Sequence, residues 1–215
     1  MSPQVIILLG KPGSGKGTQA RLLCEKLGFD YVGSGDILRK RKLKKDFFGK
    51  KIASYIDKGK RVPTIVISAL WMEKFLKLKE KKDLKGIVID GSPRTKKEAE
   101  LLEEAFDWFE WRNKKVFLID ISSKTAISRL SSRKICQKCG RIYPNPPPEE
   151  KFCRKCQGKL VQREDDTYQG IKERLRWYQK EVKVAINFYQ KKKELIKIDG
   201  EKSVEEVFKE ILSHL

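Results

Sequence analysis

The segment Gly10-Lys-Pro-Gly-Ser-Gly-Lys-Gly-Thr18 contains the residue types that bind phosphate groups. Its glycines let the backbone wrap closely around an anion with successive N–H groups pointing inward, and Lys16 supplies a positive charge for the outer phosphates. The generic phosphate-binding loop has Ser or Thr directly after the lysine, whereas here Gly17 comes before Thr18. The alternative is a flexible glycine-rich turn. An apolar run before the segment and a helical pattern after it favour the phosphate-binding interpretation.

Six arginines could hold phosphate oxygens. Transfer of a phosphoryl group needs little covalent help from a protein, because catalysis consists mostly of positioning and of stabilising charge on the transferring group. Guanidinium groups suit this task, since they form two parallel hydrogen bonds to phosphate. Any one arginine taken alone is more simply explained as a surface cation. The candidates are Arg39, Arg94, Arg129, Arg133, Arg163 and Arg174.

Three aspartates could support this chemistry. Asp90 ends the apolar run Ile87-Val-Ile-Asp90, and a carboxylate at the carboxyl end of a parallel strand faces the ligand crevice of such a sheet. We expect Asp90 to hold Mg²⁺ through coordinated water, because Mg²⁺ keeps much of its hydration shell. The alternative is that Asp90 caps the following helix. Asp165 and Asp166 are expected to orient neighbouring arginines rather than to act as bases.

Four of the five cysteines form two Cys-x-x-Cys pairs. Two such pairs can deliver four thiolates in a tetrahedron around Zn²⁺. With sulfur at all four positions no site remains for a catalytic water, so we expect a structural zinc that stabilises a short proline-rich insert with little apolar surface. Two disulfides or a redox pair are the alternative. The predicted zinc ligands are Cys136, Cys139, Cys153 and Cys156, and Cys24 falls on an apolar helix face.

Strand-like and helical patterns alternate along the chain. Apolar runs at 5–9, 87–90, 116–121 and 195–198 are typical of buried strands, and the helical patterns between them indicate a parallel sheet covered on both faces. One helical pattern places Phe48, Ile52, Tyr55 and Ile56 on one face and is expected to end at Gly59. A second runs from Ile171 to Tyr189. The last helix is expected to begin at Ser203, with Glu206 at the spacing of a capping box.

The composition sets the broad class. The chain has 215 residues with 49 Lys and Arg against 29 Asp and Glu, a formal charge of +20 that implies a polyanionic partner. No apolar run is long enough to cross a membrane and no secretory signal is recognisable, so we expect a cytoplasmic protein without membrane contact. The lysine-rich run 39–51 is interpreted as a solvated helix face, with steering of anionic nucleotides and nucleic-acid contact as alternatives.

The phosphate-binding segment also carries a resemblance. Gly-x-Pro-Gly-Ser-Gly-Lys-Gly-Thr-Gln resembles the P-loop of adenylate kinases, which contains the same extra glycine. Ser34-Gly-Asp-Ile-Leu-Arg39, Gly59-Lys-Arg-Val-Pro63, Asp90-Gly-Ser-Pro-Arg-Thr95 and Arg174-Leu-x-x-Tyr178 are similar to further motifs of that family and follow in its order. The resemblance covers nearly the whole chain.

The resemblance implies a fold and a division of the chain. The fold is α/β, a P-loop three-layer sandwich whose five-stranded parallel sheet has helices on both faces and an inserted four-cysteine zinc lid. The core comprises residues 1–32, 65–131 and 168–215. Residues 33–64 form the monophosphate-binding segment and residues 132–167 the zinc lid, which folds over the donor nucleotide.

The resemblance also implies roles for individual residues. Arg39 and Arg94 hold the monophosphate, Arg133, Arg163 and Arg174 clamp the donor phosphates, and Arg129 stacks on the donor base. The expected catalytic set is Lys16, Asp90, Arg94, Arg133, Arg163 and Arg174. The expected ATP contacts are Pro12, Gly13, Ser14, Gly15, Lys16, Gly17, Thr18, Arg129, Arg133, Tyr143 and Gly200. The expected AMP contacts are Ser34, Gly35, Arg39, Val62, Gly91, Arg94, Glu98, Arg163 and Arg174.

Two positions depart from the family pattern around the acceptor base. Glu98 stands where adenylate kinases commonly have glutamine, and Ser92 replaces a phenylalanine. A glutamine amide can donate to adenine N1 and accept from its amino group, whereas a carboxylate only accepts, and guanine offers two donors. We therefore hypothesise relaxed or guanine-tolerant acceptor selectivity. The alternative is that Glu98 is a solvated helix residue.

The resulting functional prediction is Mg²⁺-dependent, reversible phosphoryl transfer from ATP to AMP, giving two ADP, by a monomeric enzyme. A related kinase acting on another monophosphate is the first alternative. A P-loop nucleic-acid-binding ATPase with a zinc module is the alternative from a different class, and it has no use for arginines at the offsets of Arg94, Arg133, Arg163 and Arg174.

Overall fold

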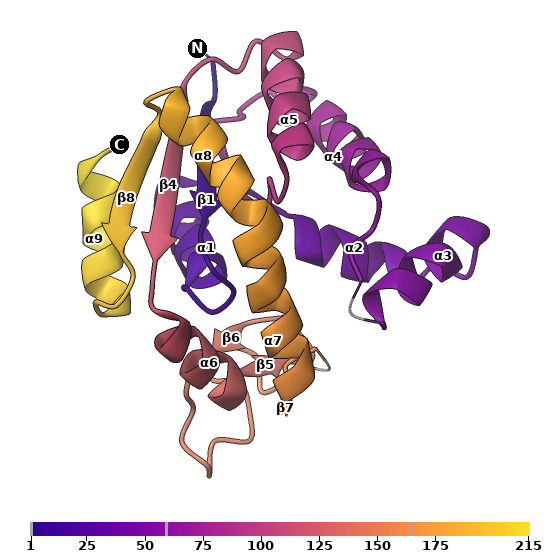
Figure 1. The fold of residues 1–215 in the computed structure, drawn as a ribbon, viewed down its shortest axis with the longest axis vertical. Coiled ribbons are helices and arrows are strands. Elements are labelled where there is room, and N and C mark those ends of the chain that lie inside the picture. The colour runs from indigo at the N-terminus through magenta and orange to yellow at the C-terminus, as the bar shows by residue number, and fades with distance from the viewer. Residues whose placement is uncertain (1, 59, 164) are drawn as a thin grey trace.

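The computed structural model describes residues 2–58, 60–163 and 165–215. Its centre is a five-stranded parallel sheet in the order β2-β3-β1-β4-β8 (Figure 1). The strands are β1 (Gln4–Leu9), β2 (Asp30–Gly33), β3 (Gly86–Asp90), β4 (Lys114–Asp120) and β8 (Leu195–Asp199). The predicted five-stranded parallel sheet is confirmed. The short edge strand β2 is the one that the apolar runs did not indicate, because only two of its four residues are buried.

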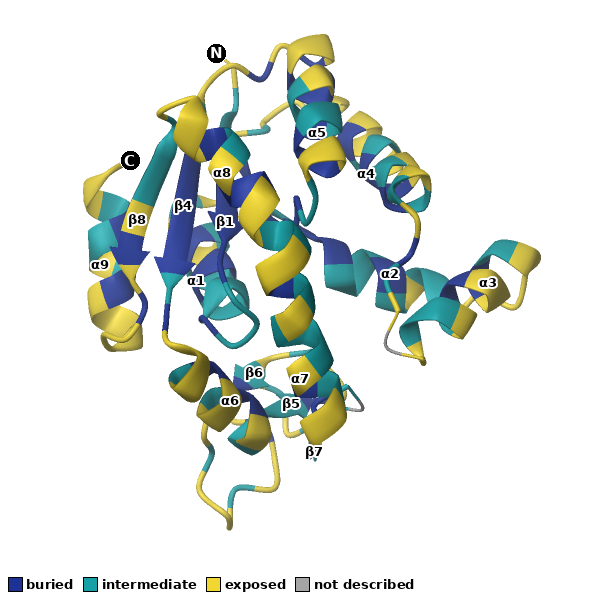
Figure 2. Cartoon of the chain, in the orientation of Figure 1, coloured by how far each residue is buried: buried dark blue, intermediate teal, exposed yellow. Residues whose placement is uncertain are grey.

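Helices cover both faces of the sheet, which confirms the three layers (Figure 2). Successive strand residues point to opposite faces, so Val5 and Ile7 pack with one set of helices while Ile6 and Leu8 pack with the other. The first set is α4 (Thr64–Lys79), α5 (Lys96–Trp108) and α8 (Lys183–Lys191). The second set is α1 (Lys16–Leu27) and α9 (Val204–Ser213), and Cys24 of α1 packs against this layer as predicted.

The predicted helix limits are mostly confirmed. The capping box at Ser203 and Glu206 is present at the start of α9. Helix α3 (Phe47–Ile56) matches the predicted apolar face, while Gly59, its expected end, lies outside the described residues. The long pattern 171–189 forms α7 (Tyr168–Trp177) and α8 joined by a π-helical segment, Tyr178–Val182, which a regular helical period does not indicate.

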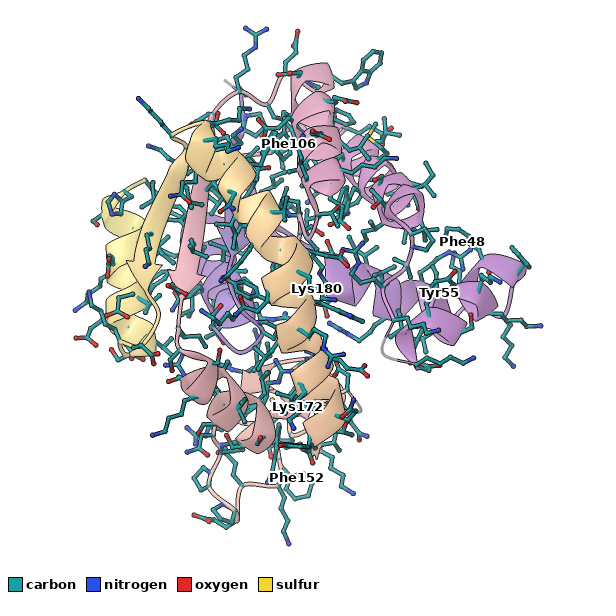
Figure 3. The ribbon with its side chains drawn as sticks, in the orientation of Figure 1. Phe48, Tyr55, Phe106, Phe152, Lys172 and Lys180 are labelled. Carbon is teal, nitrogen blue, oxygen red and sulfur yellow. The ribbon has the colours of Figure 1, made fainter. Side chains whose placement is uncertain are left out.

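Two smaller parts project from the sandwich (Figure 1). One is the pair α2 (Ser34–Lys42) and α3, on which the labelled Phe48 and Tyr55 lie well away from the sheet (Figure 3). The other follows α6 (Ser123–Ser132) and contains a small antiparallel sheet, in the order β6 (Ile142–Tyr143), β5 (Lys134–Cys136) and β7 (Leu160–Gln162). This part has a core cluster of its own, made of Cys136, Tyr143, Cys153 and Leu160. Within the described ranges, none of the helices has the length and apolar character needed to cross a membrane.

Candidate active site

The glycine-rich loop joins β1 to α1 and leaves space for an anion. Gly13 and Gly15 have φ angles of 82° and 96°, which favour glycine. Gly15 is the N-cap of α1 and has no side-chain cap, and a Cβ placed on it would meet nothing within 4 Å. The N–H groups of Gly15, Lys16 and Gly17 have no hydrogen-bond partner among the described residues, as a phosphate site at a helix N-terminus requires.

Lys16 is folded back over this loop. Its Nζ donates to the carbonyl oxygens of Gly10 at 2.9 Å and Lys11 at 2.7 Å. Burial lowers the pKa of Lys16 to about 8, the charge of Asp90 opposes this shift, and the nearby Arg94 and Arg133 add to it. The structure thus brings Lys16 within electrostatic reach of Asp90, Arg94, Arg133 and Arg174.

The lowered pKa of Lys16 predicts a pH dependence of ATP capture. Its charged form pairs with phosphate, so kcat/KM for ATP, which reports the free enzyme, should fall as the pH rises through about 8. The pKa of Lys16 in the folded protein lies below its value of about 10.4 in the unfolded chain. Between these two values the unfolded chain binds more protons, so the contribution of Lys16 to the free energy of unfolding rises with pH. Steady-state kinetics from pH 6.5 to 9.5 tests the first statement, and a flat kcat/KM would contradict it.

Three donor-side arginines form ion pairs with two carboxylates. Asp166, only 2% exposed, accepts from Nε and Nη2 of Arg133, both at 2.7 Å, and also pairs with Arg174. Asp165 accepts from Nε and Nη2 of Arg163, both at 2.9 Å, and from Arg174 at 3.2 Å. This agrees with the prediction that the aspartates orient arginines. Three cations against two carboxylates leave one positive charge for a bound anion.

The acceptor-side arginines are arranged differently. Arg94 donates from Nε to the carbonyl oxygen of Gly91 at 2.6 Å, and its two Nη groups have no hydrogen bond to the described residues. Arg39 pairs with Asp36 on α2. Burial lowers the pKa of Arg163 to about 10, with further lowering from Arg133 and from Arg39, so the donor and acceptor groups lie within electrostatic reach of each other.

Asp90 lies at the end of β3 beside Lys16 and is held by a residue that the sequence did not single out. Tyr31 on β2 donates its hydroxyl to Asp90 Oδ2 at 3.0 Å. The capping alternative is excluded, because α5 begins at Lys96 and its cap is the Thr95 side chain, which accepts from the Glu98 N–H. A single carboxylate next to a phosphate-binding loop fits Mg²⁺, which prefers one or two carboxylates together with substrate phosphates.

Glu98 is buried, which contradicts the alternative of a solvated helix residue. It is 3% exposed, and its Oε2 accepts from the backbone N–H of Arg94 at 2.6 Å. Burial raises the pKa of Glu98. Glu98 lies on the face through which α5 packs against the sheet. Its charged side chain therefore did not indicate that the position is buried.

A buried hydrogen-bond chain lies close by. Ser34 and Ser92, each 1% exposed, are 2.6 Å apart between their Oγ atoms, and the Trp71 indole N–H donates to Ser34 Oγ at 3.1 Å. Ser92 therefore stands in a polar contact where the family pattern has a phenylalanine. Trp71 was not predicted, since on α4 it reads as an ordinary core residue.

The remaining predicted nucleotide contacts are placed as follows. Arg129 donates from Nη1 to the carbonyl oxygen of Gly200 at 3.0 Å, which brings these two expected ATP contacts together. Tyr143 is buried, and its hydroxyl donates to Cys153 Sγ at 3.4 Å. Val62 is 7% exposed and packs in the main core cluster. Contacts of all these residues with a nucleotide stay predictions.

The four cysteines of the insert form one cluster. Their Sγ atoms lie within 4.8 Å of one another and all four are free thiols. The Cys136–Cys156 and Cys139–Cys153 sulfur pairs are 3.4 and 3.6 Å apart, close to the edge of about 3.8 Å in a tetrahedron with Zn–S bonds of about 2.3 Å. The hydrogen bond from Tyr143 lowers the pKa of Cys153, which favours the thiolate that a metal ion requires. The cluster therefore fits a metal ion that is held by four thiolates.

The lysine-rich run is a surface feature of α2 and α3. Lys40, Lys44, Lys45, Lys50 and Lys51 are exposed and have no carboxylate partner among the described residues, as expected for a solvated face. Arg41 differs from them, because it pairs with Asp46 and lies over the Phe48 ring.

Comparison with known proteins agrees with this arrangement. Residues 8–194 match the family model described as adenylate kinase. The chain belongs to the adenylate kinase family. It is 37% identical to an adenylate kinase of Clostridium novyi over 98% of this chain and 97% of the relative, and 41% identical to one of Methanocella arvoryzae over 94% and 93%. An adenylate kinase of Archaeoglobus fulgidus is 37% identical over 96% of this chain and 95% of its own length. As a member of this family the chain is a phosphotransferase of the nucleoside monophosphate kinase type.

Proposed function

We propose that this enzyme transfers the terminal phosphoryl group of ATP to AMP, reversibly, to give two ADP. The observation that carries the proposal is the gathering of Lys16, Arg94, Arg133 and Arg174 within electrostatic reach of one another beside the glycine-rich loop. Such cations stabilise charge on the transferring group without reorganising during the reaction.

Each group has a separate task in this proposal. The loop N–H groups and Lys16 hold the donor phosphates, while Arg133, Arg163 and Arg174, oriented by Asp165 and Asp166, approach the transferring group from the lid side. Arg39 and Arg94 hold the acceptor phosphate. Asp90 is the residue that would hold Mg²⁺, which when bound neutralises charge on phosphate oxygens.

The predicted division of the chain supports water exclusion. Residues 33–64 and 132–167 contain the projecting parts α2–α3 and the cysteine cluster, and closure of both over the nucleotides would strengthen the arginine contacts and prevent hydrolysis of ATP.

We propose Zn²⁺ as the ion of the cysteine cluster. Four clustered cysteines without a disulfide are typical of intracellular metal sites, which supports a cytoplasmic location. A monomeric state stays a prediction that sedimentation would test.

A product assay tests the proposed reaction. ATP consumption should require AMP and should yield ADP without inorganic phosphate. Release of phosphate, with stimulation by nucleic acid that falls steeply with salt, would instead favour a nucleic-acid-dependent ATPase.

Glu98 favours a second possibility for the acceptor, namely tolerance of guanine. One oxygen of its buried carboxylate is held by the Arg94 N–H, and the other has no hydrogen bond to the described residues. A carboxylate accepts only, so it complements the N1–H and amino donors of guanine better than adenine N1.

This possibility predicts the outcome of a glutamine substitution. In the unmodified enzyme kcat/KM for AMP should exceed that for GMP by less than about a hundredfold, and Glu98→Gln should shift the ratio toward AMP by about tenfold, the worth of one hydrogen bond to a charged group. Glu100→Gln, on the more exposed side of the same helix, is the matched control. An AMP preference above a hundredfold in the unmodified enzyme would refute guanine tolerance.

A further inference from the structure

We propose that Tyr31 is a positioning residue for Asp90 and that a glycine at position 33 is required for this role. The inference rests on the proposed function, in which Asp90 is the carboxylate that holds Mg²⁺. Tyr31 Oη donates to Asp90 Oδ2 at 3.0 Å, across a sequence separation of 59 residues. Asp90 Oδ1 has no hydrogen bond to the described residues, so this phenol is the group that sets the orientation of the carboxylate.

The geometry of the sheet explains how the phenol reaches Asp90. Residues i and i+2 of a strand share a face, so Tyr31 and Gly33 are neighbours on one face of β2. In the parallel ladder between β2 and β3, Gly33 is aligned with Asp90. The Tyr31 ring therefore passes over Gly33 to reach the carboxylate on the adjacent strand.

Gly33 provides the space for this path. A Cβ at Gly33 would lie 2.3 Å from Tyr31 Oη and 2.5 Å from both Cε1 and Cζ of the ring. The backbone of Gly33 has φ −95° and ψ 110°, which any residue adopts, so the requirement for glycine comes from the phenol and not from the backbone. A side chain at position 33 would displace the Tyr31 hydroxyl from Asp90.

The Tyr31 ring is also held by the helix that follows the phosphate-binding loop. The Arg21 guanidinium of α1 lies 5.1 Å from the ring centroid, and its Nη2 is 3.3 Å from Asp36 Oδ2. Burial opposes the shift, but Arg39, Arg21 and a hydrogen bond from the Tyr31 hydroxyl lower the pKa of Asp36, so the phenol also lies within reach of this second carboxylate. Rotation of an aspartate about its last torsion angle is soft, so a fixed donor on one oxygen determines which direction the other oxygen presents. A residue that acts on a metal ion through its coordinated ligands is typically worth tenfold or more in metal affinity or activity, so an Asp90 carboxylate that loses its orientation should lose an effect of this size.

Tyr31→Phe isolates the hydroxyl, because it keeps the ring and its contact with Arg21. The measurement is the affinity for a non-hydrolysable ATP analogue by titration calorimetry, with Mg²⁺ and in magnesium-free buffer without chelator, so that the lid keeps its metal ion. We expect the gain in affinity from Mg²⁺ to fall by about tenfold while the magnesium-free affinity stays unchanged. Tyr168→Phe, which removes the hydroxyl of an exposed tyrosine, is the matched control and should leave both values unchanged.

Gly33→Ala provides a second test with the Tyr31 hydroxyl still present. Its methyl group occupies the path of the phenol, so it should lower the gain from Mg²⁺ as Tyr31→Phe does. A gain within twofold of the unmodified enzyme in either variant would overturn the inference. Asp90→Asn separates this failure from that of the proposed function. If Asp90→Asn loses the gain and Tyr31→Phe keeps it, only the role of Tyr31 is wrong, whereas an unchanged gain in Asp90→Asn would refute the assignment of Mg²⁺ to Asp90 itself.

Discussion

Replacing Arg94 by lysine should lower kcat by about a thousandfold, the effect of removing one well-placed arginine from a phosphoryl-transfer site. Arg94 is fixed through Nε to the Gly91 carbonyl oxygen, and its two Nη groups have no partner among the described residues. The other clustered arginines share their donors with Asp165 and Asp166. The planar pair of Nη donors on Arg94 is therefore free for a phosphate, and a lysine keeps the charge but cannot form two parallel bonds.

Pre-steady-state measurement of the phosphoryl-transfer step checks this result, because it separates chemistry from product release. Arg176→Lys is the matched control, since Arg176 is an exposed cation on α7 outside the arginine cluster. A transfer rate in Arg94→Lys within tenfold of the unmodified enzyme would show that Arg94 contributes charge but not geometry.

Removal of the metal ion from the cysteine cluster should unfold residues 132–167 and leave the parallel sheet folded. Among the described residues of this part, the core cluster has four buried side chains, two of them cysteines, so apolar burial contributes little to its stability. A structural zinc ion can supply on the order of 10 kcal/mol of folding free energy. The sheet has separate and much larger core clusters on its two faces, which do not depend on the metal ion.

Hydrogen exchange with and without a chelator gives the direct measurement. Protection should be lost in β5 and β7 and retained in β1 and β4. The four tryptophans, at positions 71, 108, 111 and 177, all lie outside residues 132–167, so their near-ultraviolet circular dichroism reports the remaining fold. Cys153→Ser should reproduce the effect. Cys24→Ser should not, because Cys24 lies on α1 and packs against the sheet. Loss of protection in both parts in a single cooperative step would contradict a separable lid.

The patterns that depend on near neighbours in the chain were sufficient for much of this protein. Strand β1, the glycine-rich loop, the two Cys-x-x-Cys pairs and the capping box of α9 follow from spacings of two to four residues, and the structure confirms each of them. These features are predictable because the side-chain period of a strand or helix and the reach of a cap are fixed by local backbone geometry. The order of the family motifs along the chain then indicated the fold.

The tertiary structure alone decided which polar groups meet. The bond from Tyr31 to Asp90 spans 59 residues, and it forms because the register of β2 on β3 places Gly33 beside that carboxylate. The burial of Glu98 depends on how α5 packs on the sheet, and the pairing of Arg133 with Asp166 depends on where the chain returns after β7. Such contacts depend on strand register and helix packing over long sequence separations, which the period of a local pattern does not determine.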